Sequence, residues 1–310
     1  MTGLAWIAGR TTVLRPTGED GQQRTGGLPR LGFRSAGLLL ITCLLGVVGF
    51  GWPFLAGSQP GPSAGSHRQD AVWLISAVTL LVLAMVLAAL LDGGTDVKAV
   101  ALLGVLAAVG AALRPLGAGA AGIEPMFVVL ILGGRVLGPV MGFSLGSTAM
   151  LASALLTAGV GPWLPFQMLA AAWVAMGAGL LPSRVRGRGE IAMLAGYALL
   201  AGFAFGAVMN LWFWPFAVSP DLPFGYRPEA GVGANAHRYL TFYLATSLGW
   251  DLPRGLLNAF LVLVAGPRLV AALRRGVQQA AFGVAVTFRP ASTPTVPRSS
   301  PDLAKLTCPG

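Results

Sequence analysis

The stretch from Gly122 to Pro182 reads GIEPMFVVLILGGRVLGPVMGFSLGSTAMLASALLTAGVGPWLPFQMLAAAWVAMGAGLLP. After Glu124 its only charge is Arg135, and glycines and alanines are spread along its whole length. A soluble fold cannot shield this much apolar chain, so the stretch is embedded in a lipid bilayer. Its glycines and prolines predict short, closely packed and interrupted helices, which suit a protein that encloses something within the membrane.

The composition of the whole chain is that of a polytopic membrane protein. Hydrophobic residues make up 55% of the 310 residues, charged residues make up 10%, and the mean hydropathy is +0.72. A globular enzyme is far more polar. The net charge of +10 lies in tails and short loops, which favours anchoring at the cytoplasmic face over nucleic-acid binding. Cys43 and Cys308 offer neither a disulfide framework nor a metal site.

Eight apolar segments are predicted to be membrane helices, because a helix of about 20 apolar residues crosses a bilayer. The fourth segment is too short to cross alone. It is nearly continuous with the fifth around Gly133-Gly134-Arg135, where we expect a tight turn on the cytoplasmic side. The segments are Ala36–Ala56, Ala71–Leu91, Val97–Leu113, Pro125–Leu132, Val136–Thr157, Trp163–Leu181, Ile191–Phe216 and Tyr239–Val270.

These segments predict an all-α polytopic membrane protein, with a six-helix core preceded by two additional transmembrane helices. We place the arginine-rich N-terminal segment inside and count the lysines and arginines of the short loops. The count then places both termini in the cytoplasm. We therefore expect a multi-pass protein of the cell membrane. Its predicted parts are a disordered basic tail (1–34), the two additional helices (35–96), the core (97–275) and a second disordered tail (276–310).

Small residues recur every four positions on the first core helix. Gly104, Ala108 and Ala112 form one row, and Ala107 with Ala111 forms a parallel row. Such rows make a helix face smooth, so another helix can approach closely. The spacing alone leaves open whether that helix belongs to this chain or to a separate membrane subunit.

Four blocks of the core, in their order and spacing, resemble the substrate-binding S component of an energy-coupling factor (ECF) vitamin transporter, specifically the actinobacterial type. The resemblance covers about residues 97–270. It implies the S-component fold for the core, while the two helices ahead of it depart from the six-helix minimum of the family. The blocks are an Ala-rich helix ending in Arg114-Pro115, GGRVLGPVMGFSLGS at 133–147, GVGPWLPFQMLAAAWVAMGAGLLP at 159–182 and GWDLPRGLLNAF at 249–260.

The resemblance also implies an activity and partners. An S component binds a vitamin or a metal in an outward-facing cavity. Release of that substrate into the cell needs a transmembrane coupling subunit and two cytoplasmic ATPase subunits. The chain has no Gly-x-x-x-x-Gly-Lys-Ser/Thr phosphate loop, so it does not hydrolyse ATP itself, and no cofactor is implied. The small-residue face of the first core helix touches the coupling subunit in this family, which makes the docking candidates Gly104, Ala107, Ala108, Ala111 and Ala112.

Polar and aromatic side chains near the outer ends of the core helices are the candidate ligand contacts. The tryptophans could instead form an aromatic belt at the membrane interface. Asp251, Arg254 and Asn258 share one helix face, and they either pair among themselves or form a polar pocket wall or a latch linked to coupling. The full candidate set is Trp163, Gln167, Asn210, Trp212, Trp214, Tyr239, Tyr243, Trp250, Asp251, Arg254 and Asn258.

The remaining features concern the substrate and the competing classes of protein. The long segment from Ser219 to Arg238 is rich in Pro and Gly and is predicted to cover the cavity mouth. His67 and His237 are the only histidines and are far apart, so a metal substrate is not expected. Aromatic residues and few charges favour a large, mostly neutral, ring-bearing ligand. The resemblance makes cobalamin or a related corrinoid the leading candidate and leaves riboflavin, thiamine and biotin open.

A membrane enzyme and a structural membrane protein are the alternatives to a transporter subunit. An intramembrane serine protease needs a histidine at membrane depth, and neither histidine lies in a predicted span. The sequence also lacks His-Glu-x-x-His and any Asp-Asp-x-x-Asp cluster, which argues against metalloprotease and prenyl-transfer chemistry.

Overall fold

The computed structural model describes residues 32–55, 76–85, 87–88, 91, 97–117 and 122–281. His67, Cys308 and nearly all of the two predicted tails lie outside these residues. The described part of the chain folds into helices joined by turns, without a strand. The helices are α1 (Phe33–Leu55), a short helix Ser76–Met85, α3 (Val97–Gly117), α4 (Met126–Leu137), α5 (Pro139–Leu156), α6 (Leu164–Leu180), α7 (Arg188–Ala217), the 3₁₀ turn η2 (Pro228–Ala230), α8 (Gly231–Thr246) and α9 (Leu248–Ala281).

Eight of these helices are apolar, in the order that the sequence predicts. Five of them, α1, α3, α5, α7 and α9, are long and apolar enough to cross a membrane, and the helix Ser76–Met85, α4 and α6 are shorter apolar helices. The prediction of an all-α polytopic membrane protein is confirmed.

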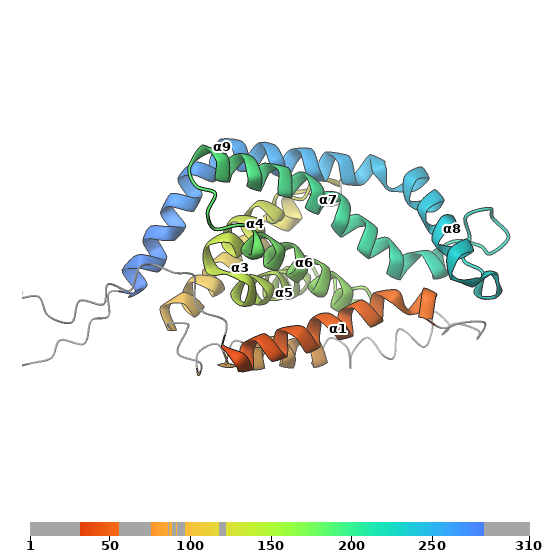
Figure 1. Ribbon diagram of the computed structural model, residues 1–310, viewed down its shortest axis with the longest axis horizontal. Coiled ribbons are helices and arrows are strands. Elements are labelled where there is room, and N and C mark those ends of the chain that lie inside the picture. Colours follow the sequence, from red (N-terminus) through yellow and green to blue (C-terminus); the bar gives the residue numbers. More distant parts are fainter. Residues whose placement is uncertain are drawn as a thin grey trace, which may run out of the picture.

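The helices are arranged as a compact group flanked by longer ones (Figure 1). Helices α3, α4, α5 and α6 form the group, and α5 packs extensively on both α3 and α6. Helices α7 and α9 run side by side along one flank, and α1 lies along another. At 30 and 34 residues, α7 and α9 exceed the ~20 residues that cross a bilayer. Their far ends therefore project beyond the compact group, where α8 packs against them.

Glycines place α4, α5 and α6 in backbone contact. A Cβ atom on Gly134 or Gly146 would collide with the carbonyl groups of Ala175 and Ala171 on α6. The small residues of the opening stretch thus serve close helix packing, which in a membrane depends on van der Waals contact rather than on the hydrophobic effect.

The turn between α4 and α5 lies three residues later than predicted. Gly133, Gly134 and Arg135 are helical, and α4 ends at Leu137, followed by the C-cap Gly138, whose φ is +85°. Only glycine adopts this backbone conformation without strain, and Pro139 then occupies the first turn of α5, where its missing N–H costs nothing. The prediction that Gly133-Gly134-Arg135 forms the turn is wrong.

The C-terminal part of the core also differs from its prediction. The expected span Tyr239–Val270 consists of two helices, α8 and α9, which meet at Ser247. The segment from Ser219 to Arg238 is not structureless, because it holds η2 and the first half of α8. Helix α9 continues to Ala281, beyond the boundary at residue 275.

Candidate functional site

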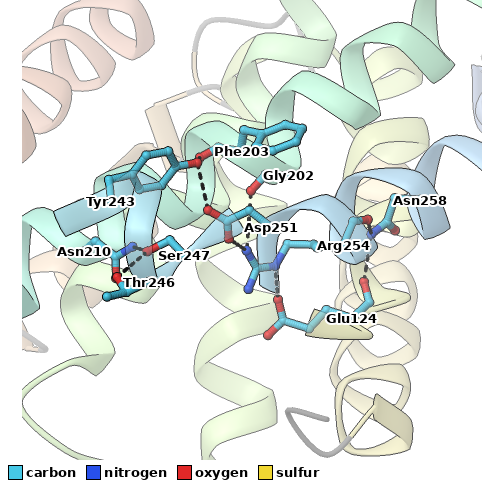
Figure 2. A network of polar contacts seen from close by, with 10 residues as sticks. All are labelled: Glu124, Gly202, Phe203, Asn210, Tyr243, Thr246, Ser247, Asp251, Arg254 and Asn258. Atoms are coloured by element: carbon cyan, nitrogen blue, oxygen red, sulfur yellow. Dashed lines mark hydrogen bonds and ion pairs between the residues drawn. The ribbon is translucent and has the colours of Figure 1, made fainter. Parts of the chain in front are cut away.

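A buried network of charges centres on Arg254 of α9. Its Nε donates to Glu124 Oε2 at 2.6 Å, and its Nη1 donates to Asp251 and to the carbonyl oxygen of Gly202. Asp251 is 2% exposed and Arg254 is 9% exposed. Figure 2 shows the guanidinium between the two carboxylates. The planar fork of an arginine can hold two carboxylates at fixed angles, which a lysine cannot do.

Glycines on α7 allow α9 to approach this closely. A Cβ on Gly202 would lie 2.7 Å from the Cα of Gly255, and a Cβ on Gly206 would collide with the carboxylate of Asp251. The face of Arg254 is covered by Phe205, with 5.3 Å between the guanidinium carbon and the ring centroid. This cation–π contact further stabilises a charge held away from water.

The network continues into α8 and along α9 (Figure 2). The hydroxyl of Tyr243 lies 2.9 Å from Asp251 Oδ2 and 3.2 Å from the carbonyl oxygen of Phe203. Asn258 Nδ2 donates to the backbone oxygens of Glu124, at 3.1 Å, and of Arg254, at 2.8 Å. Within the described residues the Oδ1 atom of Asn258 is buried without a hydrogen-bond partner, so it is an acceptor that a donor could still satisfy.

A neighbouring hydrogen bond links α7 to the junction of α8 and α9. Asn210 Nδ2 donates to the hydroxyl of Ser247, which also lies 3.3 Å from that of Thr246. The amide of Asn210 thereby finds the partner that a polar group at membrane depth requires.

Arg114 adds a second cation near the network. Its charge interacts with that of Glu124, and its Nη2 donates to Gln167 Oε1 at 3.2 Å. With Glu124 and Asp251 as anions and Arg114 and Arg254 as cations, the formal charge of these four residues is zero. A site that is balanced internally does not require a charged ligand.

An aromatic cluster lies where α7, α8 and α1 meet. Its centre is Trp214, fully buried, whose Nε1 donates to the carbonyl of Phe224 at 2.7 Å. Tyr226 donates to the carbonyl of Pro53 on α1 at 3.0 Å, and burial together with the charge of Glu229 raises the pKa of its hydroxyl. Trp214 packs edge-on against Tyr226 and Tyr239. This packing gives Trp214 and Tyr239 a structural role in the cluster, with Tyr239 also donating to the carbonyl of Ala207.

Trp212 faces a different neighbourhood from Trp214. Its ring lies 5.6 Å from Phe166 and 6.4 Å from Phe216 between ring centroids. Among the described residues, its buried Nε1 has no hydrogen-bond acceptor. A buried donor without an acceptor is a group that a bound ligand could still satisfy.

The structure therefore divides the predicted ligand contacts. It brings together Asn210, Tyr243, Asp251, Arg254 and Asn258 around one network, and it links Gln167 to Arg114 beside it. In contrast, Trp163 is 40% exposed and Trp250 is 50% exposed. Both lie at helix starts on the surface, as expected for an interfacial belt.

Glu124 and Gly202 are members of the network that the sequence did not single out. Glu124 is the only acid in the opening stretch, and an isolated acid in apolar chain is the signal that could have identified it. Nothing in the local sequence marks Gly202 apart from the other glycines.

The predicted docking face also divides in two. Gly104, Ala108 and Ala112 are exposed on α3, and a Cβ on Gly104 would meet no described atom within 4 Å. Ala107 and Ala111 are 2% and 0% exposed and face the interior of the bundle. Neighbouring rows on a helix point in different directions, so in the isolated chain only the row of Gly104, Ala108 and Ala112 faces outward, and a docking role for either row stays a prediction.

The architecture defines the class of the protein before any comparison. It is a multi-pass membrane protein whose interior carries a charge network bridging helices distant in sequence. The family model described as "ECF transporter, substrate-specific component" matches residues 98–266, more than half of the chain, and the chain belongs to this family. It is a transporter subunit, not an enzyme. No curated protein and no solved structure matches the chain.

Proposed function

We propose that this S component captures a vitamin from the outside and passes it inward together with a coupling subunit and two ATPase subunits. The observation that carries the location of the site is the convergence of Glu124, Asp251, Arg254 and Asn258 between α4, α7 and α9. In a bilayer, ionisable groups placed in the interior are costly and mark ligand pathways or moving parts.

The chemistry of the site favours a neutral, ring-bearing substrate. The charges of the network balance one another, and Trp212, Phe166 and Phe216 supply flat apolar surfaces between α6 and α7. Trp212 Nε1 would donate to the ligand and Asn258 Oδ1 would accept from it, since both atoms are buried without partners among the described residues. A corrinoid such as cobalamin is the leading substrate, and riboflavin, thiamine and biotin are the alternatives.

The charge network is proposed to act as a latch as well as a wall. It ties the segment before α4 to α9, and Tyr243 ties α8 to Asp251. Ligand contact with Asn258 would act on the residue that already holds the backbone of Glu124. Binding would thereby change how firmly α4, α8 and α9 are held together.

The orientation proposed for the chain has both termini in the cytoplasm. Arg184, Arg186 and Arg188 precede or begin α7, and Arg274 and Arg275 lie near the end of α9. Arg274 bonds to Glu190, so these arginines gather at one end of the bundle, which the positive-inside rule assigns to the cytoplasm. The Glu124 network then lies toward the outer side.

The test of this function is the identity of a bound small molecule. The full chain is purified in mild detergent, small molecules released by denaturation are identified by mass spectrometry, and the purified protein is titrated with cobalamin, riboflavin, thiamine and biotin by calorimetry. A copurifying vitamin, or one titrating with a Kd below 1 μM (~8 kcal/mol of binding free energy), is the expected result. A protein that neither copurifies with nor binds any vitamin contradicts the proposal.

A further inference from the structure

A cleft of about 540 Å³ lies between the start of α7 and the C-terminal half of α9, far from the Glu124 network. The two helices are in backbone contact at Gly202 and Gly255, whereas near the cleft a Cβ on Gly266 would lie 3.5 Å from the Ile191 side chain. Pro267 lies inside α9 at this level, and a proline within a helix bends it. Figure 1 shows the C-terminal part of α9 turning away from α7.

One end of the cleft carries an excess of positive charge. Glu190 is the only acid among the described residues that line the cleft, and this carboxylate already accepts from Arg274 Nη2 at 2.7 Å and from Arg135 Nε at 2.7 Å. Arg274 remains 45% exposed. Arg188 also lines the cleft, is exposed, and forms no ion pair with any residue that the structure describes.

The first turn of α7 adds to this positive potential. The helix begins at Arg188, no side chain caps its N-terminal N–H groups, and Glu190, the acid of its first turn, is already paired with Arg135 and Arg274. Uncapped N–H groups and the helix dipole both favour an anion beside a helix start. The guanidinium groups of Arg188 and Arg274 line the same cleft. This arrangement favours an anion such as a phosphodiester, which arginine binds through paired N–H donors.

The walls of the cleft are apolar and belong to membrane helices. Ile191 lies on α7, Leu263 and Val270 lie on α9, and Leu263 is 54% exposed. Both helices are long and apolar enough to cross a bilayer, so such a side chain faces lipid. A water-soluble anion would use the arginines but gain nothing from these walls, whereas a phospholipid would use both.

We propose that this cleft binds an acidic phospholipid, with its phosphodiester between Arg188 and Arg274 and its acyl chains along α7 and α9. Basic pockets between membrane helices on the cytoplasmic side are suited to anionic headgroups. The bound lipid would bridge the two helices at the end where they diverge. The site is separate from the vitamin site and does not depend on the identity of the vitamin.

The test compares lipid binding by charge and by position. The full chain in detergent is incubated with equal amounts of phosphatidylglycerol and phosphatidylcholine, and retained lipid is measured by native mass spectrometry. We expect wild type to retain phosphatidylglycerol about tenfold over phosphatidylcholine, and Arg188→Ala with Arg274→Ala to abolish this preference. The control pair Arg186→Ala with Arg275→Ala removes two exposed arginines outside the cleft and should leave it unchanged.

A second pair of variants tests the walls without changing charge. Ala271 lines the cleft, whereas its exposed neighbour Ala272 does not. Ala271→Trp should displace the lipid, and Ala272→Trp should not. If the double arginine variant fails to fold, Arg188→Ala alone serves, because it breaks no ion pair among the described residues.

Four outcomes would overturn the proposal. The first is equal retention of the two lipids by wild type. The second is an equal loss of the lipid preference in both arginine pairs, which would mean unspecific attraction. The third is thermal stabilisation of the protein by glycerol phosphate or inorganic phosphate equal to that by phosphatidylglycerol, which would mean that the cleft binds a soluble anion. The fourth is unchanged lipid retention combined with lost association of the coupling subunit in the cleft variants, which would assign the cleft to that subunit.

Discussion

The guanidinium of Arg254 donates through Nε to the carboxylate of Glu124 at 2.6 Å and so joins residues 130 positions apart in the chain. Asn258, one turn further along α9, donates to the backbone oxygen of Glu124. These two bonds fix the entry to α4 against α9. When a buried cation loses its acceptor, its charge is left unpaired in an apolar environment. The loss in folding free energy is then larger than for the same change at a surface.

We predict that Arg254→Lys lowers the stability of the protein although it keeps the charge. The fork of Arg254 serves Glu124, Asp251 and the carbonyl of Gly202 at once, and an ammonium group cannot reach all three. A loss of about 2 kcal/mol is expected, since removing a partner from a buried pair costs about 3–5 kcal/mol. Thermal unfolding in detergent measures it. Arg275→Lys is the control. An equal Tm for both variants would contradict the claim that the guanidinium of Arg254 serves three acceptors at once.

Helix contact at Gly202 gives a second prediction. Gly202→Ala places a Cβ 2.7 Å from the backbone of Gly255, so α7 and α9 must separate. The expected destabilisation is about 1–3 kcal/mol, the usual cost of overpacking. Gly196 lies on the same helix with no described atom within 4 Å of its Cβ position, so Gly196→Ala should leave the Tm unchanged or slightly higher. Two variants with the same melting temperature would show that the helices are not in backbone contact.

The sequence predicts the helices of this protein well and some of their ends poorly. Long apolar runs specify a membrane helix almost regardless of detail, because every backbone group must be bonded within the span. The Gly133-Gly134 pair looks like a helix break in sequence. In the structure the helix continues through both glycines, and Gly134 allows the close contact with Ala175 on α6. A glycine used for packing and a glycine used for a turn look alike until the neighbouring helix is known.

The candidate site shows the same limit for side chains. The pairing of Asp251 with Arg254 follows from their separation of three residues on one helix. The pairing of Arg254 with Glu124 does not, because local spacing carries no information about which helices are neighbours. Likewise Trp212 and Trp214 are two residues apart, yet one lies among Phe166 and Phe216 and the other among Tyr226 and Tyr239.

The third prediction concerns α1, whose role the sequence left unassigned. Gly46 of α1 is buried, and a Cβ there would lie 2.6 Å from the ring of Trp173 on α6. Phe50, one turn later, packs on Phe166 and Trp173. Gly46→Leu should therefore push α1 away from α6 and lower the Tm, whereas Gly37→Leu, with no described atom within 4 Å of its Cβ position, should not. If Gly46→Leu melts like wild type, α1 is not an integral part of the bundle.

The same displacement should reach the proposed substrate site, and this can be measured separately. Phe166 contacts both Phe50 of α1 and Trp212 of α7. Gly46→Leu is expected to weaken vitamin binding through this chain of rings, with Gly37→Leu as the matched control. Unchanged affinity together with a lower Tm would restrict α1 to stability.

The last prediction is that the exposed small-residue row of α3 docks the coupling subunit. Ala108→Trp and Ala112→Trp place a large ring on a face where Gly104 has open space, and close helix approach depends on small side chains. Association with the coupling subunit, measured by copurification after coexpression, should fall at least tenfold, while the Tm and vitamin binding of the isolated chain stay unchanged. Leu200→Trp, on the exposed face of α7, is the control for adding a ring elsewhere.

Ala111→Trp should behave differently, because Ala111 is fully buried. It should lower the Tm of the isolated chain itself. If Ala108→Trp and Ala112→Trp associate as well as Leu200→Trp does, the coupling subunit docks on another face.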